Sequence, residues 1–266
     1  MIKGNILAVS FCFIAYITYS QNKINKLSDS FEEENFITNW GGIEKCCAYS
    51  IQRSDSVAKS GNYSLRFELR KDDSLVANGK RAEIKLKAEA SPNVERWYRF
   101  SYFLPDNYKN DSIPEILAQW HEIPDWDLGE DWRSPPLSLF TQNGQWKFLI
   151  MWATDKVNTN KTISGRKMID LGEYETGRWT EWIFHLYFSY KEDGLVQIWK
   201  NGELVVDYHG PNYYNDKSGP YFKVGIYKWD WKNPSKESTV TQRVFFIDDV
   251  RVGDDTFDFN KISGKF

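Results

Sequence analysis

Cysteine is scarce in this sequence: only three occur among 266 residues, and two of them are adjacent. Cys12 lies in an N-terminal apolar segment, so the rest of the chain holds only Cys46 and Cys47. Adjacent cysteines can close only a strained ring, and the sequence therefore predicts no disulfide framework. The stability of the fold must come from a hydrophobic core instead.

A surplus of positive charge is also missing. Lysine and arginine number 34 against 37 aspartates and glutamates, and the formal net charge is −3. A protein that binds nucleic acid usually carries a basic field that attracts phosphates. We therefore expect no nucleic-acid partner.

Long hydrophobic runs are absent apart from Ile6 to Tyr19, which is too short for a membrane span. Lys3 precedes this run, and the small residues Thr18 and Ser20 stand where a signal peptidase would cut. The pattern predicts a signal peptide over residues 1–20 and a polar leader over residues 21–30. We expect a secreted or periplasmic protein with no membrane span after cleavage.

Helical periodicity is nearly absent, whereas strand signals recur with turn residues between them. Many strands, short turns and no repeat period predict an all-β fold, a β-jelly-roll sandwich of two antiparallel sheets. No linker divides the chain, so we expect a single domain over residues 31–266 and a monomer. The predicted strands are Phe31–Phe36, Tyr63–Leu69, Arg81–Lys87, Trp97–Leu104, Glu115–His121, Leu137–Thr141, Trp146–Trp152, Trp179–Tyr190, Val196–Lys200, Glu203–Tyr208, Tyr221–Tyr227 and Thr241–Val252.

Aromatic residues are abundant. They make up 17% of the chain, more than core filling usually needs, and exposed aromatic rings are a common platform for the faces of sugars. Residues 122–136, 212–220 and 230–239 form longer loops that carry aromatic side chains. Loops of this length are often functional, although these could equally be padding at the ends of the sandwich. Trp126, in the first loop, is the candidate there for a substrate contact.

The clearest alternation lies in residues 221–229. Tyr221, Lys223, Tyr227 and Trp229 share one face, because side chains on a strand change faces with a period of two. The other face is apolar until its last member. Such a strand suits the wall of a sugar-binding groove, although a half-buried strand with a solvated outer face would show the same pattern.

Two further strands carry polar faces. Arg81, Glu83 and Lys85 alternate with apolar residues, and Gln119 and His121 share a face at the end of an apolar strand. Each pattern also has an ordinary structural explanation: a charge ladder that neutralises itself, and a histidine held by hydrogen bonds. Together with the tyrosine-rich strand, they predict a cationic, hydrogen-bonding floor flanked by tryptophans, which suits an acidic polysaccharide.

Such a floor contains the groups needed for β-elimination across C4–C5 of a uronate. An enzyme must neutralise the carboxylate, remove the C5 proton and protonate the leaving O4. Arg81 and Gln119 would stabilise the charge that builds on the carboxylate, and His121 is a third candidate for this role. His121 or an ionised Tyr227 would take the C5 proton, and Tyr227 would protonate O4. Lys223 and Arg81 would lower the pKa of the tyrosine from about 10, and the chemistry needs no cofactor.

Three motifs occur in a fixed order: Arg-x-Glu at 81–83, Gln-x-His at 119–121 and Tyr-Phe-Lys-x-Gly-x-Tyr at 221–227. They resemble those of the jelly-roll polysaccharide lyases, which include alginate lyases, glucuronan lyases and heparin lyase I. Residues 116–121, followed by Ser-Pro-Pro-Leu at 134–137, are most similar to the glucuronan lyase and heparin lyase I branch. The resemblance spans roughly residues 31–252.

The resemblance implies that Gln119, His121 and Tyr227 carry catalysis, and that Arg81 and Lys223 bind substrate carboxylates. We also assign Arg81 to catalysis, because it would neutralise the uronate. The other residues expected to bind substrate are Lys85, Glu83, Tyr221, Trp229 and Trp126.

The sequence departs from the alginate branch at two positions. Lys85 stands where alginate lyases usually have a second arginine, and Trp229 stands where they often have glutamine. The acidic net charge also disfavours a sulfated polymer of the heparin type. A β-1,4-linked glucuronate polymer is the expected substrate, with alginate, ulvan and heparin-type glycans as alternatives. In glucuronate, H5 and O4 lie on the same side, so one tyrosine could act as base and acid, with His121 auxiliary.

Three acidic or polar segments, residues 31–34, 60–65 and 246–250, lie near the chain ends and beside predicted strands. Carboxylates and loop carbonyls are ligands that calcium prefers, and the pattern resembles the structural calcium site of many jelly-roll carbohydrate-binding modules. Glu32 and Asp249 are the predicted ligands. Solvated acidic residues at strand ends would give the same pattern.

Two other functional classes fit parts of the sequence. A carbohydrate-binding module would use the aromatic and cationic residues, but it has no need for tyrosine, histidine and glutamine on one floor. A glycoside hydrolase would need two carboxylates facing each other across the groove. Glu83 is the only acid on the strand faces described above, so the hydrolase ranks last.

Overall fold

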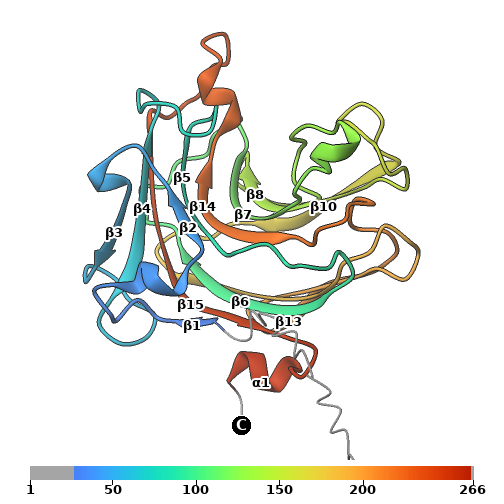
Figure 1. Ribbon diagram of the computed structural model, residues 1–266. Coiled ribbons are helices and arrows are strands. Elements are labelled where there is room, and N and C mark those ends of the chain that lie inside the picture. Colours follow the sequence, from blue (N-terminus) through green and yellow to red (C-terminus); the bar gives the residue numbers. More distant parts are fainter. Residues whose placement is uncertain (1–26, 265–266) are drawn as a thin grey trace, which may run out of the picture.

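Two antiparallel β-sheets lie face to face in the computed structural model, which describes residues 27–264 (Figure 1). The eight-stranded sheet has the order β13 (Glu203–His209), β12 (Leu195–Lys200), β11 (Trp179–Tyr187), β6 (Glu95–Phe103), β15 (Gln242–Gly253), β4 (Ser64–Arg70) and β3 (Ile51–Ser54), with β1 (Leu27–Asp29) paired to β15. The seven-stranded sheet has the order β10 (Gly165–Glu173), β9 (Gln145–Trp152), β8 (Leu137–Gln142), β7 (Glu115–His121), β14 (Tyr221–Tyr227), β5 (Arg81–Lys85) and β2 (Gly42–Glu44). The short helix α1 (Phe259–Ser263) packs outside the eight-stranded sheet, and the predicted jelly-roll sandwich is confirmed (Figure 1).

Aromatic side chains from both sheets fill the space between them. The Phe222 ring of β14 lies 5.3 Å from that of Trp120 on β7 and 5.6 Å from that of Phe100 on β6. Burying one such side chain stabilises a fold by about 1.5–3 kcal/mol, so this contact between the sheets contributes strongly to the stability of the fold. Because Phe222, Val224 and Ile226 all face the core, the intervening residues of β14 are directed to the opposite face of the sheet.

The N-terminal strand predictions were partly wrong. Residues Phe31–Phe36 form turns and the start of a 3-10 helix (Phe36–Asn39), not a strand. Phe31 has a positive φ of 58°, and its backbone N–H donates to Asp29 Oδ1 at 2.9 Å, which closes a tight turn. The strand lies earlier, at β1, inside the stretch predicted to be a polar leader.

Three strands had no clear sequence signal. β2 and β3 are short edge strands, and most of β10 is exposed on both faces, so none shows the alternation of a half-buried strand. The predicted signal peptide lies outside the described residues, as does Cys12. Within residues 27–264, no helix has the length and apolar character needed to cross a membrane.

Cys46 and Cys47 form a disulfide with each other. The bond follows β2 directly and joins residues that are already adjacent in the chain. It therefore connects no two distant elements, and the fold depends on its core as expected.

Candidate active site

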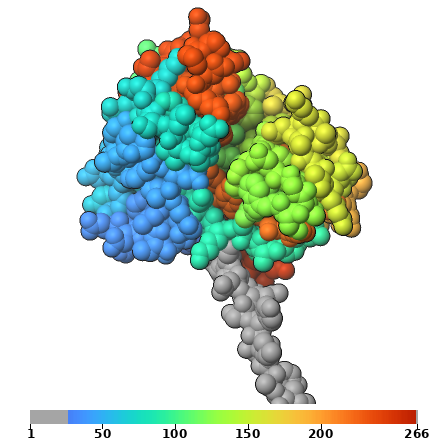
Figure 2. All heavy atoms as spheres, turned by 45° about the horizontal axis from the view of Figure 1, so that its top comes forward, coloured from blue at the N-terminus to red at the C-terminus, as the bar shows by residue number. Residues whose placement is uncertain are grey.

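A cavity of about 710 Å³ opens over the face of the seven-stranded sheet that points away from the core. Figure 2 shows the hollow between a lobe of blue, cyan and orange atoms and a lobe of green and yellow atoms. The predicted site residues that line it are Arg81, Lys85, His121, Tyr221, Lys223, Tyr227 and Trp229.

The strand order explains why three motifs far apart in the sequence meet here. β14 lies between β7 and β5, which places Lys223 opposite Gln119 on one side and opposite Lys85 on the other. At one end of β14, Tyr221 lies opposite His121, and at the other end Tyr227 lies opposite Arg81. The floor of the groove therefore has a histidine end and an arginine end.

Gly225 allows β14 and β5 to approach closely in the middle of this floor. Its φ is +138°, and a Cβ there would lie 2.2 Å from the carbonyl oxygen of Ala82. The register between β14 and β7 shifts between Val224 and Tyr227. A side chain at this position would collide with β5, so the close approach of the two strands requires glycine here.

A carboxylate with no distinguishing sequence pattern lies in the middle of the site. Glu44, on the edge strand β2, accepts hydrogen bonds from Lys85 Nζ at 2.7 Å and from Lys223 Nζ at 2.8 Å. Arg81 Nη1 lies 3.2 Å from Glu44 Oε2 and 3.2 Å from Glu83 Oε2. Lys223 Nζ also donates to Glu83 Oε2 at 2.7 Å.

Three cations therefore share two carboxylates, and the floor is less cationic than predicted. Burial acts to raise the pKa of Glu44, but the charges and hydrogen bonds of Lys223 and Lys85 outweigh it and lower this pKa to about 2. Glu44 is thus ionised at neutral pH and holds the ammonium groups in place.

Gln119 and Glu83 lie beneath the floor and do not line the cavity. Their exposed fractions are 1% and 2%, and Gln119 Nε2 donates to Glu83 Oε1. Among the described residues, no group hydrogen-bonds Gln119 Oε1. The Gln119 amide has two N–H donors, and the contact with Glu83 uses only one of them.

Tyr227 lies against the guanidinium group of Arg81, whose central carbon is 4.0 Å from the ring centroid. Burial raises the pKa of Tyr227, and this effect outweighs the lowering by Arg81. The predicted lowering was wrong for a physical reason: desolvation dominates, and the ammonium of Lys223 is bound to two carboxylates instead. Tyr227 is therefore a neutral phenol at physiological pH, ready to donate a proton.

His121 lies at the other end of the floor, between two aromatic rings. It stacks on Tyr221 at 5.4 Å between ring centroids and meets the edge of Trp132 at 5.5 Å. Trp132 lines the cavity, although the sequence identified only its loop as a candidate. Burial raises the pKa of Tyr221 well above its ordinary value, so this phenol is also neutral.

His121 and Tyr227 line the same cavity from opposite ends of the floor. Tyr227 pairs with Ile116, five residues before His121 on β7, which corresponds to about 17 Å of strand. The His121 ring stacks on Tyr221, and the Tyr227 ring lies against Arg81.

Two predicted tryptophans flank the floor in different ways. Trp229 follows β14 in a 3-10 helix (Trp229–Lys232), lines the cavity and lies 6.0 Å from the Tyr227 ring. Trp126 does not line the cavity. It is 52% exposed and meets Trp132 edge-on at 5.4 Å, so it extends the aromatic surface beyond the groove.

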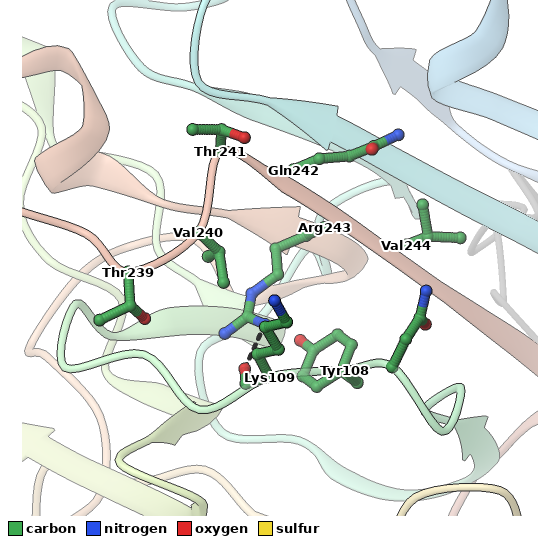
Figure 3. Close-up of a pocket in the computed structure, with 9 residues that line it drawn as sticks. Tyr108, Lys109, Thr239, Val240, Thr241, Gln242, Arg243 and Val244 are labelled. Carbon is green, nitrogen blue, oxygen red and sulfur yellow. Dashed lines mark hydrogen bonds between the residues drawn. The ribbon is translucent and has the colours of Figure 1, made fainter.

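A second cavity, of about 260 Å³, contains none of the predicted site residues. Figure 3 shows Arg243 of β15 reaching toward the backbone oxygen of Lys109, beside the ring of Tyr108. Arg243 also donates to the buried Glu115 at 2.7 Å. Its guanidinium is therefore used by the core, and we assign this cavity no substrate.

The acidic segments predicted to bind calcium do lie together, but their oxygens already serve protein donors. Glu32 Oε1 accepts from the backbone N–H groups of Asn62 and Tyr63, each at 3.0 Å. Asp249 Oδ1 accepts from Ser60 Oγ at 2.6 Å, and Arg99 approaches the other oxygen of Asp249 at 3.7 Å. The calcium ion stays a prediction.

Comparison with known proteins supports the family assignment. The family model described as polysaccharide lyase matches residues 28–251. Among solved structures, an endo-β-1,4-glucuronan lyase from the fungus Trichoderma reesei gives a TM-score of 0.70 at 19% identity, with coverage of 85% of this chain and 94% of that chain. A marine PL-14 alginate lyase from Aplysia kurodai gives a TM-score of 0.57 at 13% identity, with coverage of 87% and 98%.

No curated protein sequence matches this chain. The identities to the solved structures are low, so those similarities establish the shared fold. The family model covers most of the chain, from β1 to β15. The chain belongs to the polysaccharide lyase family.

Proposed function

We propose that this lyase is a secreted or periplasmic monomer that cleaves a β-1,4-linked glucuronate polymer by β-elimination and needs no cofactor for catalysis. The observation that carries the proposal is the composition of one groove floor. A neutral tyrosine, an arginine over its ring, two lysines and a histidine line the same cavity. These groups match the three tasks of elimination: charge neutralisation, proton removal and protonation of the leaving oxygen.

In the proposed mechanism, Arg81 neutralises the charge that builds on the uronate carboxylate, and Gln119 supports Arg81 from beneath through Glu83, which it binds. Tyr227 protonates O4 as the C4–O4 bond breaks, because its raised pKa keeps it protonated. The C5 proton goes either to His121 or to Tyr227 in its ionised form, which would then pass that proton to O4. The Lys223 and Lys85 ammonium groups bind the carboxylates of the sugars in the groove.

The proposed substrate rests on departures from the alginate pattern and on charge. Lys85 and Trp229 both line the groove, at positions where alginate lyases usually have arginine and glutamine. Three cations balanced by two carboxylates suit a polymer with one carboxylate per sugar better than one with several sulfates. The similar fungal structure is itself a glucuronan lyase, which favours the same polymer.

Hydrolysis is a poorer fit to the same groove. Among the described residues, Glu44 is the only carboxylate that lines the cavity. Its pKa of about 2 keeps it ionised, so it cannot donate a proton to a leaving oxygen at neutral pH. A glycosidase would need a protonated carboxylic acid on one side of the sugar.

The first test is ultraviolet absorbance during incubation with glucuronan, alginate, heparin and ulvan. Elimination creates a C4=C5 double bond conjugated to the carboxylate, whereas hydrolysis and binding do not. We expect a rise with glucuronan. A rise with another polymer would identify that polymer as the substrate instead. No absorbance change with any polymer, while polymer still binds, would favour a carbohydrate-binding module.

Substitution of Arg81 by alanine should lower kcat/KM by about 100-fold, because the uronate carboxylate loses its cation. Arg81→Lys should recover only part of this loss, since an ammonium cannot stack on Tyr227 and bridge two carboxylates at once. Arg178→Ala, which removes an arginine side chain that is 68% exposed, is the matched control. Unchanged efficiency in Arg81→Ala would place this arginine outside the mechanism.

A further inference from the structure

Glu122, the residue after the β7 strand, lies against the ring of His121. Its carboxylate oxygen Oε2 is 2.6 Å from His121 Nδ1, and its backbone oxygen accepts a hydrogen bond from the same nitrogen at 3.2 Å. The backbone oxygen is hydrogen-bonded to the ring, whereas the carboxylate oxygen Oε2 lies close to the nitrogen without a hydrogen bond. Neither oxygen can donate, so Nδ1 must carry the proton.

The other ring nitrogen is left for the groove. Among residues 27–264, no group hydrogen-bonds His121 Nε2, and His121 lines the cavity. With Nδ1 protonated, the neutral ring has its electron pair on Nε2. This nitrogen can accept a proton but cannot donate a hydrogen bond to a carboxylate.

The Glu122 carboxylate is itself fixed by a buried ion network. The backbone N–H of Arg133 donates to Glu122 Oε1 at 3.2 Å, and the guanidinium of Arg133 contacts Glu130 and Asp216 at 2.8 Å each. All four side chains are at most 1% exposed. Buried networks of this kind hold their members in one geometry.

We propose that Glu122 is a positioning residue that holds His121 in the tautomer with its proton on Nδ1, so that Nε2 faces the substrate as a base. The catalytic meaning of this tautomer rests on the proposed elimination. In that step the C5–H bond breaks and its proton passes to Nε2, while its electron pair forms the C4=C5 double bond. The C4–O4 bond breaks, and O4 takes the proton of Tyr227.

The other titratable groups around His121 fit this assignment. Tyr221 stacks on the ring, and its phenol is neutral because burial raises its pKa. On its other side, Glu122 is close to Arg133, which is paired with Glu130 and Asp216. The ring of Tyr214 lies 4.6 Å from the Arg133 guanidinium. Burial raises the pKa of Asp216 to about 7.

The decisive variant is Glu122→Gln, because the geometry predicts which way the new amide turns. The backbone N–H of Arg133 needs an acceptor, so the single amide oxygen would face Arg133 and the NH₂ group would face His121 Nδ1. An NH₂ group close to Nδ1 would disfavour a proton there and favour one on Nε2, in competition with the backbone oxygen of residue 122, which still accepts from Nδ1 at 3.2 Å. We expect kcat on glucuronan to fall about 10- to 100-fold with KM changed less than about threefold.

Glu130→Gln is the matched control. Glu130 belongs to the same buried network and contacts Arg133, but it does not touch His121. This variant should lose stability to a similar degree while keeping kcat within about twofold of the wild type. An equal loss of kcat in both variants would mean that Glu122 acts only through stability, and would overturn the proposal.

Nitrogen-15 NMR of the histidine rings in the unmodified protein tests the tautomer without substrate and without substitution. The chain has three histidines, and removing His185 and His209 in turn assigns the signals. We expect the neutral ring of His121 to carry its proton on Nδ1 and none on Nε2, whether or not glucuronan is the substrate. The reverse tautomer would overturn the role of Glu122 and leave Tyr227 as the base, with the proposed elimination intact.

Discussion

Tyr227→Phe is expected to abolish nearly all turnover while leaving polymer binding and thermal stability unchanged. The phenyl ring would keep its stacking on Arg81 and its contact with Gly79, so the floor would hold its shape. Only the hydroxyl that protonates O4 is lost, and general acid catalysis contributes about 10²- to 10⁴-fold. We expect the initial rate of ultraviolet absorbance increase to fall about 1000-fold, with the Kd for glucuronan within about threefold of the wild type.

Tyr221→Phe is the matched control on the same strand. It removes the hydroxyl of a tyrosine at the histidine end of the groove and keeps the ring that stacks on His121. We expect a rate loss below about tenfold there, because stacking needs the ring and not the hydroxyl. Retained turnover in Tyr227→Phe would remove Tyr227 from the mechanism.

The pH dependence of the wild type gives a second measurement of the same hydroxyl. A group acting as an acid must be protonated, and burial raises the pKa of Tyr227 above its ordinary 10. Activity on glucuronan should therefore persist up to about pH 10 before it falls. A loss of activity near neutral pH on the alkaline side would indicate a different acid.

The floor of the groove was predictable from sequence because strand alternation is a local property. Residues 221–227 show a period of two, and the structure buries Phe222 and Val224 while Tyr221 and Tyr227 line the cavity. Lys228, the last member of the buried face, is fully buried and paired with Asp111 and Glu115. The alternation predicted correctly that Lys228 lies on the buried face, but it did not predict that Asp111 and Glu115 would pair with it.

Glu44 and Glu122 were not predictable because tertiary contacts decide their roles. Glu44 lies on a three-residue edge strand without alternation, and it meets Lys223 only because β5 brings β2 near β14. Glu122 follows a strand as any loop acid would, and its burial depends on Arg133. The direction of the Tyr227 pKa was missed for a related reason: sequence shows nearby cations but not how deeply a phenol is buried.

Lys223→Met is expected to destabilise the fold by up to about 3–5 kcal/mol. Its ammonium is 1% exposed and donates to Glu44 and Glu83 at 2.8 and 2.7 Å. Removing one partner of a buried ion pair costs about 3–5 kcal/mol when the other charge is left alone. Here Glu44 keeps Lys85 and Arg81, and Glu83 keeps Arg81, so this figure is the upper end of the expected loss. Urea unfolding at pH 7 measures it, and Lys147→Met, whose ammonium lies 3.9 Å from the exposed Asp170, should cost below about 1 kcal/mol.

The loss of unfolding free energy in Lys223→Met should depend on pH, because Lys223 stabilises the fold partly through its ion pair with Glu44. The pKa of Glu44 is about 2 in the folded protein against an ordinary 4.5, so its contribution is complete above pH 4.5 and is lost as the pH falls toward 2. In the variant, ionised Glu44 contributes less to stability, so less stability is lost when the pH falls. The stability difference between wild type and variant should therefore be widest at pH 7 and smaller at pH 3, whereas a difference that stays constant would show that Lys223 stabilises the fold through packing of its stem and not through its charge.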